Sequence, residues 1–271
     1  MPYFRHQELP YDTIRLVQII EEITGDPIEV AMTKVQAMQF PDFLTFMKDW
    51  WQPGMHGAVV GPTGEGKTTL MKPLLGQRKY VMALDAKGID ETLEKYGYLR
   101  ITELPGGKLP RKVVKEIQDG NPVRLVVGGA ADSDQADASL AQLMKQALNM
   151  ARQQGGWTLY ADELQVLGDR GMMNLGKSIE RMLVTYRAKK GSVVTSFQAP
   201  SWVPQAAMRQ ISWATIMPTR DEDMIEKLAR SFGRNRKELV AMVHELPPYH
   251  DLVVTRNVRA PIILINPPKL G

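Results

Sequence analysis

Eight consecutive residues match the phosphate-binding pattern G-x-x-x-x-G-K-[ST] at every specified position, namely Gly61-Pro62-Thr63-Gly64-Glu65-Gly66-Lys67-Thr68. Glycines let the backbone turn tightly enough for successive N–H groups to converge on a phosphate, and a helix that starts here adds its positive N-terminal end. Lys67 would bring a positive charge to the β- and γ-phosphates, and the Thr68 hydroxyl would be a ligand of Mg²⁺. The pattern predicts a P-loop with ATP and Mg²⁺ as cofactors, and nucleotide contacts from Gly61, Pro62, Thr63, Gly64, Glu65, Gly66, Lys67, Thr68 and Thr69.

The residues on either side of this loop fit the same interpretation. Residues 56–60 read as a short buried strand, and residues 69–72 continue as a helix. Strand, loop and helix therefore occur in the order that a P-loop requires. The alternative is a glycine-rich turn with a purely structural role.

A second acidic motif lies further along the chain. Residues 157–161 read as a buried strand that is followed directly by Asp162 and Glu163. In the resulting hypothesis Asp162 is a Mg²⁺ ligand, and Glu163 is the general base that orients and polarises the attacking water. The alternative is an ordinary surface pair of carboxylates.

Composition limits the other classes of function. The 271 residues, 44% hydrophobic and 24% charged, suit one α/β domain with an appendage or two small domains. The net charge of +4 allows a polyanionic partner. The absence of cysteine excludes disulfides and thiolate metal sites, and the four histidines lack metal-ligand spacing: His6, His56, His244 and His250.

Targeting signals are absent from the sequence pattern. No apolar run is long enough to cross a bilayer, and the first eight residues lack the charged-then-apolar order of a signal peptide. We therefore expect a soluble, cytoplasmic protein, which a partner would have to hold if it works at a membrane.

The first 52 residues are expected to be a small extension that packs on an ATPase core formed by residues 53–271. Within the extension, residues 13–20 fit a strand or a helix equally well. Five large side chains then follow at helical spacing, and they either pack on the core or form a base clamp or subunit contact: Phe43, Phe46, Met47, Trp50 and Trp51.

The remaining pattern alternates strands and helices, which predicts an α/β fold. Strands are expected at 79–84, 98–102, 123–127, 157–161, 192–198 and 213–217, helices at 89–96, 136–154, 179–186, 221–232 and 237–244, and a closing β-hairpin at 251–255 and 261–265. Asp85 and Lys87 follow a strand, so they are either ligand contacts or part of a solvated turn. The segment 104–112 reads as an exposed basic loop, and Lys108–Lys112, Arg170 and Lys177 are candidate DNA contacts.

The ordered motifs over about residues 54–246 resemble the HerA/FtsK branch of P-loop ATPases. The discriminating stretch is 186–201, which is similar to the family's helix, sensor strand and Thr-Gln-x-Pro-Ser segment, with Ser196 in the Thr position and Phe197 before Gln198. Residues 85–88 are similar to the Asp-x-Lys-Gly turn of conjugation-type members.

The resemblance implies a RecA-like (ASCE) P-loop NTPase fold, a three-layer sandwich with the P-loop strand central and the Walker B and sensor strands beside it. It further implies a homo-oligomeric ring, most simply a hexamer, that moves double-stranded DNA. Lys67 and Glu163 would then act with Gln198, which would sense the γ-phosphate or the attacking water, and with Arg187 as an arginine that crosses into the neighbouring subunit. Arg181 is the second candidate for that arginine, and a surface salt bridge is the alternative role for Arg187.

Among members of this branch, phage or viral genome packaging fits the chain best, with a portal or a membrane-anchored protein as a possible partner. The alternatives are a conjugation-type coupling ATPase, an assembly factor similar to the zonular-occludens-toxin-like proteins, and a P-loop kinase. DNA-stimulated hydrolysis separates a motor from an assembly factor.

Overall fold

The computed structural model describes residues 35–86, 93–129, 137–169, 173–198, 208–256 and 260–267, together with residues 18, 21 and 22. The expectations for residues 13–17, for Lys87 and for Arg170 lie outside these residues. Among the described residues no helix combines the length and the apolar character needed to span a membrane.

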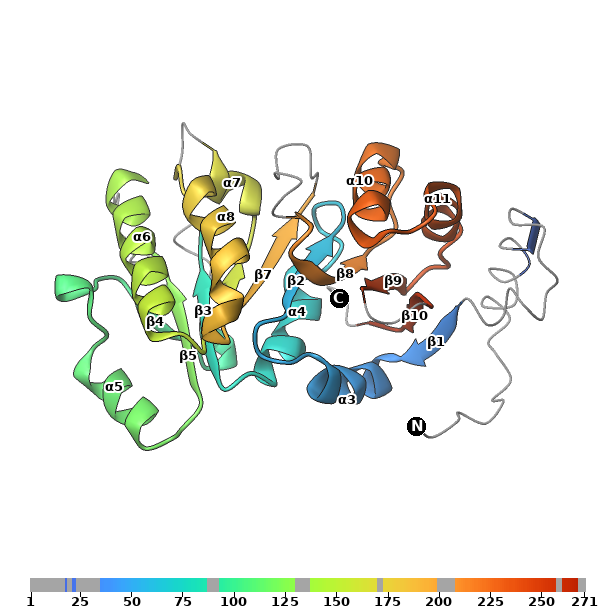
Figure 1. Cartoon of the computed structure of the whole chain (residues 1–271). Coiled ribbons are helices and arrows are strands. Elements are labelled where there is room, and N and C mark those ends of the chain that lie inside the picture. The colour runs from blue at the N-terminus through green and yellow to red at the C-terminus, as the bar shows by residue number, and fades with distance from the viewer. Residues whose placement is uncertain are drawn as a thin grey trace.

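One ten-stranded sheet organises the described residues (Figure 1), in the order β1-β10-β9-β8-β2-β7-β6-β3-β5-β4. The strands are β1 (Gln36–Gln39), β2 (His56–Val60), β3 (Tyr80–Leu84), β4 (Leu99–Ile101), β5 (Val123–Val127), β6 (Thr158–Ala161), β7 (Ser192–Phe197), β8 (Ile211–Ile216), β9 (His250–Thr255) and β10 (Ile262–Ile265). From β4 to β8 all neighbouring strands are parallel. β9 and β10 form the expected closing hairpin and extend the sheet in the antiparallel sense beyond β8.

The order of the central strands refines the expectation from the sequence. The P-loop strand β2 pairs with β7 on one side and with β8 on the other. The strand before Asp162 and Glu163, which is the expected Walker B strand, is β6, and it pairs with β7 and β3. β6 is therefore not a direct neighbour of β2, because the sensor strand β7 lies between them. Sheet order depends on pairing between distant segments, which local sequence pattern does not encode.

Helices cover both faces of the sheet (Figure 1). One face carries α3 (Phe40–Trp50) and α4 (Lys67–Gly76), and the other carries α5 (Arg111–Gln118), α6 (Asp137–Gln154), α7 (Leu164–Gly168), α8 (Gly176–Thr185), α10 (Glu222–Phe232) and α11 (Arg236–His244). Strand alternation explains the two cores: Ala58 and Val60 of β2 pack with the second group of helices, whereas Val59 packs with the first. The predicted three-layer α/β sandwich is confirmed.

The segment 104–112 differs from the basic loop that was expected. It contains a 3₁₀ turn, η2 (Pro105–Gly107), and α5 begins at Arg111. Leu104 and Leu109 are buried in the core beneath it, while Lys108 and Lys112 are exposed. Two buried leucines fix this segment to the body of the protein. Of the helix expected at 89–96, residues 93–96 are described, and they contain the short 3₁₀ turn η1 (Glu94–Tyr96).

The aromatic residues before the P-loop strand lie partly in the core. Phe43, Met47 and Trp51 are buried against residues of α4 and the sheet. The ring of Trp51 meets that of Trp213 edge-on, with the ring centroids 5.3 Å apart. The division of the chain at residue 52 into extension and motor stays a prediction.

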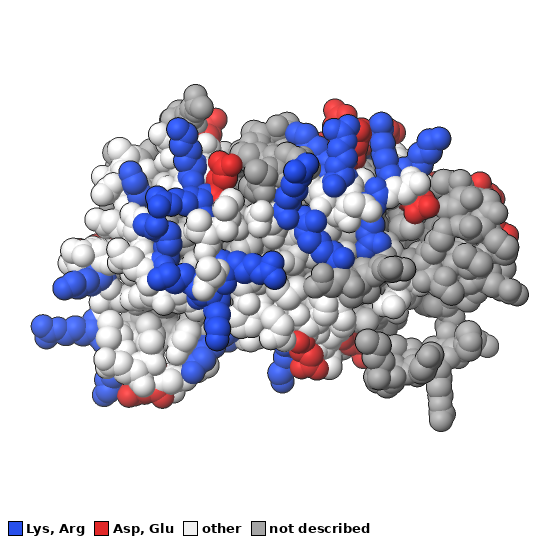
Figure 2. Space-filling model, viewed as in Figure 1, with Lys and Arg blue, Asp and Glu red and all other residues white. Residues whose placement is uncertain are grey.

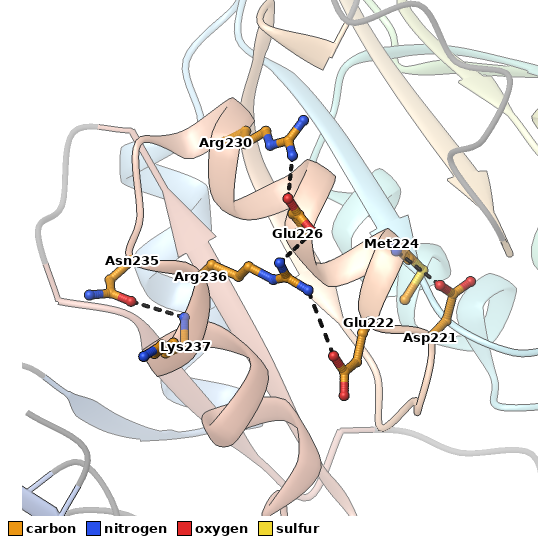
Figure 3. A network of polar contacts seen from close by, with 8 residues as sticks. All are labelled: Asp221, Glu222, Met224, Glu226, Arg230, Asn235, Arg236 and Lys237. Carbon is orange, nitrogen blue, oxygen red and sulfur yellow. Dashed lines mark hydrogen bonds and ion pairs between the residues drawn. The ribbon is translucent and has the colours of Figure 1, made fainter.

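Local capping explains the pair α10 and α11, whose position the sequence predicts correctly (Figure 3). The Asp221 carboxylate accepts a hydrogen bond from the Met224 N–H, and the Asn235 side chain accepts one from the Lys237 N–H, which begins each helix. Between them Gly233 ends α10 with a φ of 64°. Arg236 then bridges Glu222 and Glu226 and ties the start of α11 to α10.

His56, at the start of the P-loop strand, is buried and neutral. Its Nδ1 accepts a hydrogen bond of 3.0 Å from the Val193 N–H of β7, which fixes this nitrogen in its unprotonated form. Burial lowers the pKa of His56 from 6.5 to about 4, with a hydrogen bond to the Leu183 backbone opposing the shift and the charge of Arg187 adding to it. The histidine is therefore a structural acceptor between β2 and β7.

This lowered pKa predicts acid-sensitive folding. As the pH falls below 6.5 the unfolded chain gains a proton on His56, whereas the folded chain does not until about pH 4, so stability is lost between these values. We expect His56 to account for a loss of about 2 kcal/mol in the free energy of unfolding between about pH 7.5 and about pH 5. Urea titrations of the wild type and of His56→Gln at both pH values measure it, and an equal pH dependence in the two proteins would contradict the assignment.

Candidate active site

The P-loop connects the carboxyl end of β2 to α4. Gly64 and Gly66 adopt φ values of 85° and 88°, in the left-handed region that favours glycine. Gly61 has no room for a side chain, because a Cβ there would lie 2.7 Å from the Cβ of Met217. The glycine positions of the sequence motif thus correspond to positions where the backbone requires glycine. The first helical residue of α4 is Lys67, so the positive end of the helix faces the loop.

The Lys67 ammonium lies across the loop. Its Nζ donates hydrogen bonds to the carbonyl oxygens of Gly61 at 2.9 Å and Pro62 at 2.6 Å. Partial burial lowers the pKa of Lys67, and the carboxylates of Asp162, Glu163 and Glu65 oppose this shift. Lys67 is thus close enough to both acidic residues of the second motif to be affected by their charges.

The two motifs are joined by a direct contact between side chains. The Thr68 hydroxyl donates a hydrogen bond of 2.9 Å to Oδ2 of Asp162, which follows β6. Mg²⁺ prefers oxygen ligands and commonly uses only one or two protein ligands beside the phosphates of a nucleotide. A hydroxyl and a carboxylate at this separation, next to a phosphate-binding loop, fit such an ion.

A third residue, Ser196 of β7, completes the arrangement around Asp162. Its hydroxyl donates a hydrogen bond to Oδ1 of Asp162 and accepts one of 3.2 Å from the backbone N–H of Glu163. The sequence places Ser196 in the Thr position of the sensor segment but does not identify this contact. The sequence feature that could have indicated this contact is the alternation of side chains along β7. It directs Ser196 toward the same face as the P-loop helix and Phe197 into the opposite core.

Gln198 also lies at this edge of the sheet. It directly follows β7, and the carbonyl of its neighbour Phe197 accepts a hydrogen bond of 3.2 Å from the Gly61 N–H at the start of the P-loop. The structure thus brings together Gly61–Thr69, Asp162, Glu163 and Gln198. Whether Gln198 senses phosphate stays a prediction.

Arg187 lies at the opposite edge. It belongs to the 3₁₀ turn η3 (Tyr186–Lys189), which leads into β7. Its neighbour in space is Gly54, which precedes β2: a Cβ on Gly54 would lie 3.2 Å from Cγ of Arg187. A six-residue strand spans roughly 20 Å, so Arg187 is remote from the P-loop of its own chain.

Asp85 is neither a solvated turn residue nor an open ligand contact. Its side chain is buried, with the residue only 7% exposed, and it forms an ion pair of 3.1 Å with Arg100 of β4. Arg100 also pairs with Glu94 at 3.0 Å. The polar end of β3 is therefore committed to an internal network.

A surface cleft of about 560 Å³ lies away from these residues. It is formed by η2, α5 and the end of α6, and Lys108 and Arg111 are among its lining residues. None of the predicted nucleotide contacts lines it.

Several solved structures have a fold similar to that of this chain. No family model and no curated protein matches the sequence. The genome packaging NTPase B204 from Sulfolobus turreted icosahedral virus 2, in complex with AMPPCP, is similar with a TM-score of 0.54 and 20% identity over 78% of this chain and 97% of that chain. The chain shares the RecA-like α/β fold of this NTPase.

Two further solved structures share this fold. B204, the DNA-packaging ATPase from Sulfolobus turreted icosahedral virus, has a TM-score of 0.52 and 18% identity over 81% of this chain and all of that chain (100%). VirB4 of Thermoanaerobacter pseudethanolicus has a TM-score of 0.52 and 11% identity over 78% of this chain and 88% of that chain. These TM-scores support a shared architecture, and the resemblance seen in the sequence is confirmed at the level of the fold.

Proposed function

We propose that this chain hydrolyses ATP and uses the energy to move double-stranded DNA, as one subunit of a homo-oligomeric, hexameric ring in genome packaging or a related DNA transfer. The observation that carries the ATPase part is the Thr68–Asp162 hydrogen bond, which joins the phosphate-binding loop to the acidic motif. Similarity in fold to proteins described as packaging NTPases supports the choice of process. We place the motor in the cytoplasm, held by a portal or a membrane-anchored protein where its role requires one.

Each site residue has a separate task in this proposal. The loop amides and Lys67 bind the β- and γ-phosphates, while Thr68 and Asp162 would hold Mg²⁺. When bound, the ion neutralises charge on the phosphates. The half-buried Glu163 carboxylate accepts a proton from the water that attacks the γ-phosphate. We assign Gln198, which directly follows β7, the role of sensing the γ-phosphate or this water.

Substituting Glu163 by Gln tests the proton-transfer step. The amide keeps the size of the side chain but is a poor base, so we expect turnover to fall by about 10²–10⁴-fold while ATP still binds. Lys67→Ala is the matched comparison, because it should weaken nucleotide binding itself. Steady-state hydrolysis and equilibrium binding of a fluorescent ATP analogue distinguish the two effects. Normal turnover by Glu163→Gln would exclude Glu163 as the base.

The location of Arg187 favours action between subunits. Because Arg187 is exposed at the edge of the sheet opposite its own P-loop, it can approach a γ-phosphate only if that phosphate belongs to a neighbouring subunit. An arginine that crosses over in this way stabilises the charge of the transition state and makes hydrolysis depend on assembly. Arg181, exposed on α8, is the second candidate.

Mixed assemblies test this role. Arg187→Ala subunits lack the arginine but keep an intact base, whereas Glu163→Gln subunits lack the base but keep the arginine. We expect a mixture of the two inactive proteins to regain part of the wild-type ATPase rate, since some interfaces then combine a good base with a good arginine. The same experiment with Arg181→Ala is the control, and a mixture that stays inactive would remove Arg187 from the site.

A positively charged surface supports the choice of DNA as substrate. In Figure 2, Lys and Arg side chains gather over α6 and α8. We use the name basic face for seven basic residues of α6, α8, η3 and the position directly after η3. They are Lys145, Arg152, Lys177, Arg181, Arg187, Lys189 and Lys190. Within the described part of the chain none of them forms an ion pair with an Asp or Glu side chain, so their charges are open to phosphates. Such contacts give sequence-independent binding.

Neutralising lysines tests DNA binding without touching either arginine candidate. The basic-face variant carries Lys177→Gln, Lys189→Gln and Lys190→Gln, and its control carries Lys48→Gln, Lys115→Gln and Lys237→Gln on α3, α5 and α11. Each lost phosphate contact lowers the slope of log affinity against log salt by about 0.9. We expect the basic-face variant to lose about 2–3 from this slope, and the control to lose less than about 1.

Fluorescence anisotropy with a duplex of mixed sequence, between about 50 and about 200 mM salt, measures both slopes. Equal slopes in the two variants would contradict the basic face as the DNA surface. An ATPase rate that duplex DNA does not change would favour the protein-assembly alternative over the motor.

A further inference from the structure

Ser196 occupies the strand between the two chemical motifs. In the sheet it is level with Val59 of β2, two residues before the P-loop begins, and on the other side Thr195 is level with Ala161, the residue before Asp162. Ser196 is completely buried. Its hydroxyl thus lies between the phosphate-binding loop and the acidic pair, shielded from bulk water.

The two oxygens of Asp162 are held by different parts of the chain. Oδ2 accepts the hydroxyl of Thr68 at 2.9 Å, while Oδ1 accepts the hydroxyl of Ser196. A carboxylate held at one oxygen still rotates about its side-chain bonds, whereas one held at both oxygens keeps a single orientation. Oδ1 also accepts the Glu163 N–H at 3.0 Å, so Ser196 is the side chain from the neighbouring strand that, together with this N–H, holds the direction in which Asp162 presents its oxygen to Thr68.

The same hydroxyl also acts on the backbone of Glu163. This residue has a φ of 49° and a ψ of 56°, a left-handed conformation that is unfavourable for a residue with a side chain. Its N–H is directed at two acceptors, Oδ1 of Asp162 at 3.0 Å and Oγ of Ser196 at 3.2 Å. These contacts offset part of the conformational cost, and the backbone angle determines where the Glu163 carboxylate points.

We propose that Ser196 is a positioning residue for ATP hydrolysis: its hydroxyl orients the Asp162 carboxylate toward the Mg²⁺ ligand position and holds the backbone of Glu163 in the conformation that directs its side chain at the attacking water. The inference rests on the proposed ATPase function. It assigns Ser196 no contact with the nucleotide. The sensor strand thereby links Gln198, two residues further on, to the acidic pair.

The neighbouring residue provides a matched control. Thr195 is also buried on β7, but its hydroxyl has no hydrogen-bond partner among the described residues. Thr195→Val removes a hydroxyl from the same strand with nearly the same volume. Any effect on strand packing should therefore be similar in Ser196→Ala and Thr195→Val, and a larger effect in the former reports the contacts to Asp162 and Glu163.

The test compares the wild type, Ser196→Ala, Ser196→Thr and Thr195→Val in three measurements: steady-state ATP hydrolysis, affinity for ATPγS with Mg²⁺ and with EDTA, and urea unfolding. Loss of a residue that orients a metal ligand typically costs about 10–100-fold in activity or metal affinity. For Ser196→Ala we expect a fall of this size in kcat with little change in KM. The gain in ATPγS affinity on adding Mg²⁺ should shrink, while affinity in EDTA stays at the wild-type value.

Ser196→Thr should restore both properties, because threonine retains the hydroxyl. Wild-type kcat and wild-type Mg²⁺ dependence in Ser196→Ala would overturn the proposal, as would an equal loss in Thr195→Val. A wild type that does not hydrolyse ATP would overturn the proposed function instead, and the Mg²⁺-dependent affinity would still decide the role of Ser196 toward Asp162.

Discussion

The hydrogen bond between Thr68 and Asp162 constrains the whole centre of the molecule. These residues follow β2 and β6, which are not neighbours, because β7 runs between them. Two strand spacings place β2 and β6 about 10 Å apart, so the two side chains meet only by reaching across the end of β7. The residue of β7 on that face must therefore be small and must donate a hydrogen bond to a partly buried carboxylate. Serine meets both requirements, and Ser196 is the residue found there.

The rest of the sheet supports this geometry. β2, β7 and β6 are buried along their whole length, so their positions are fixed by side chains packed on both faces. At the amino ends of the strands, His56 of β2 accepts the Val193 N–H of β7. Arg78 donates both to the Thr158 hydroxyl at the start of β6 and to the Ser192 hydroxyl at the start of β7. The three strands that carry the chemistry are thus joined by side-chain contacts at both ends. A site at the carboxyl ends of these strands is therefore held rigidly as well.

The sequence predicts the chemical roles of the site residues better than it predicts how the strands bring these residues together. The P-loop motif specifies a local conformation, and the observed angles of Gly64 and Gly66 are those that glycine permits. Asp162 and Glu163 could be assigned because a buried strand precedes them. The position of β7 between β2 and β6, and the contact of Ser196 with Asp162, depend on pairing between segments far apart in the chain. The ion pair between Asp85 and Arg100 is equally non-local, and no pattern near Asp85 in the sequence predicts it.

The two ends of β7 suggest how neighbouring sites in a ring would communicate. Ser196 and Gln198 lie at its carboxyl end beside the candidate nucleotide site of the same chain, whereas Arg187 lies just before its amino end. If Arg187 completes the site of a neighbour, one buried and fully paired strand connects two active sites. Because a strand held on both sides cannot bend freely, a shift at the Ser196 end would move the Arg187 end with it.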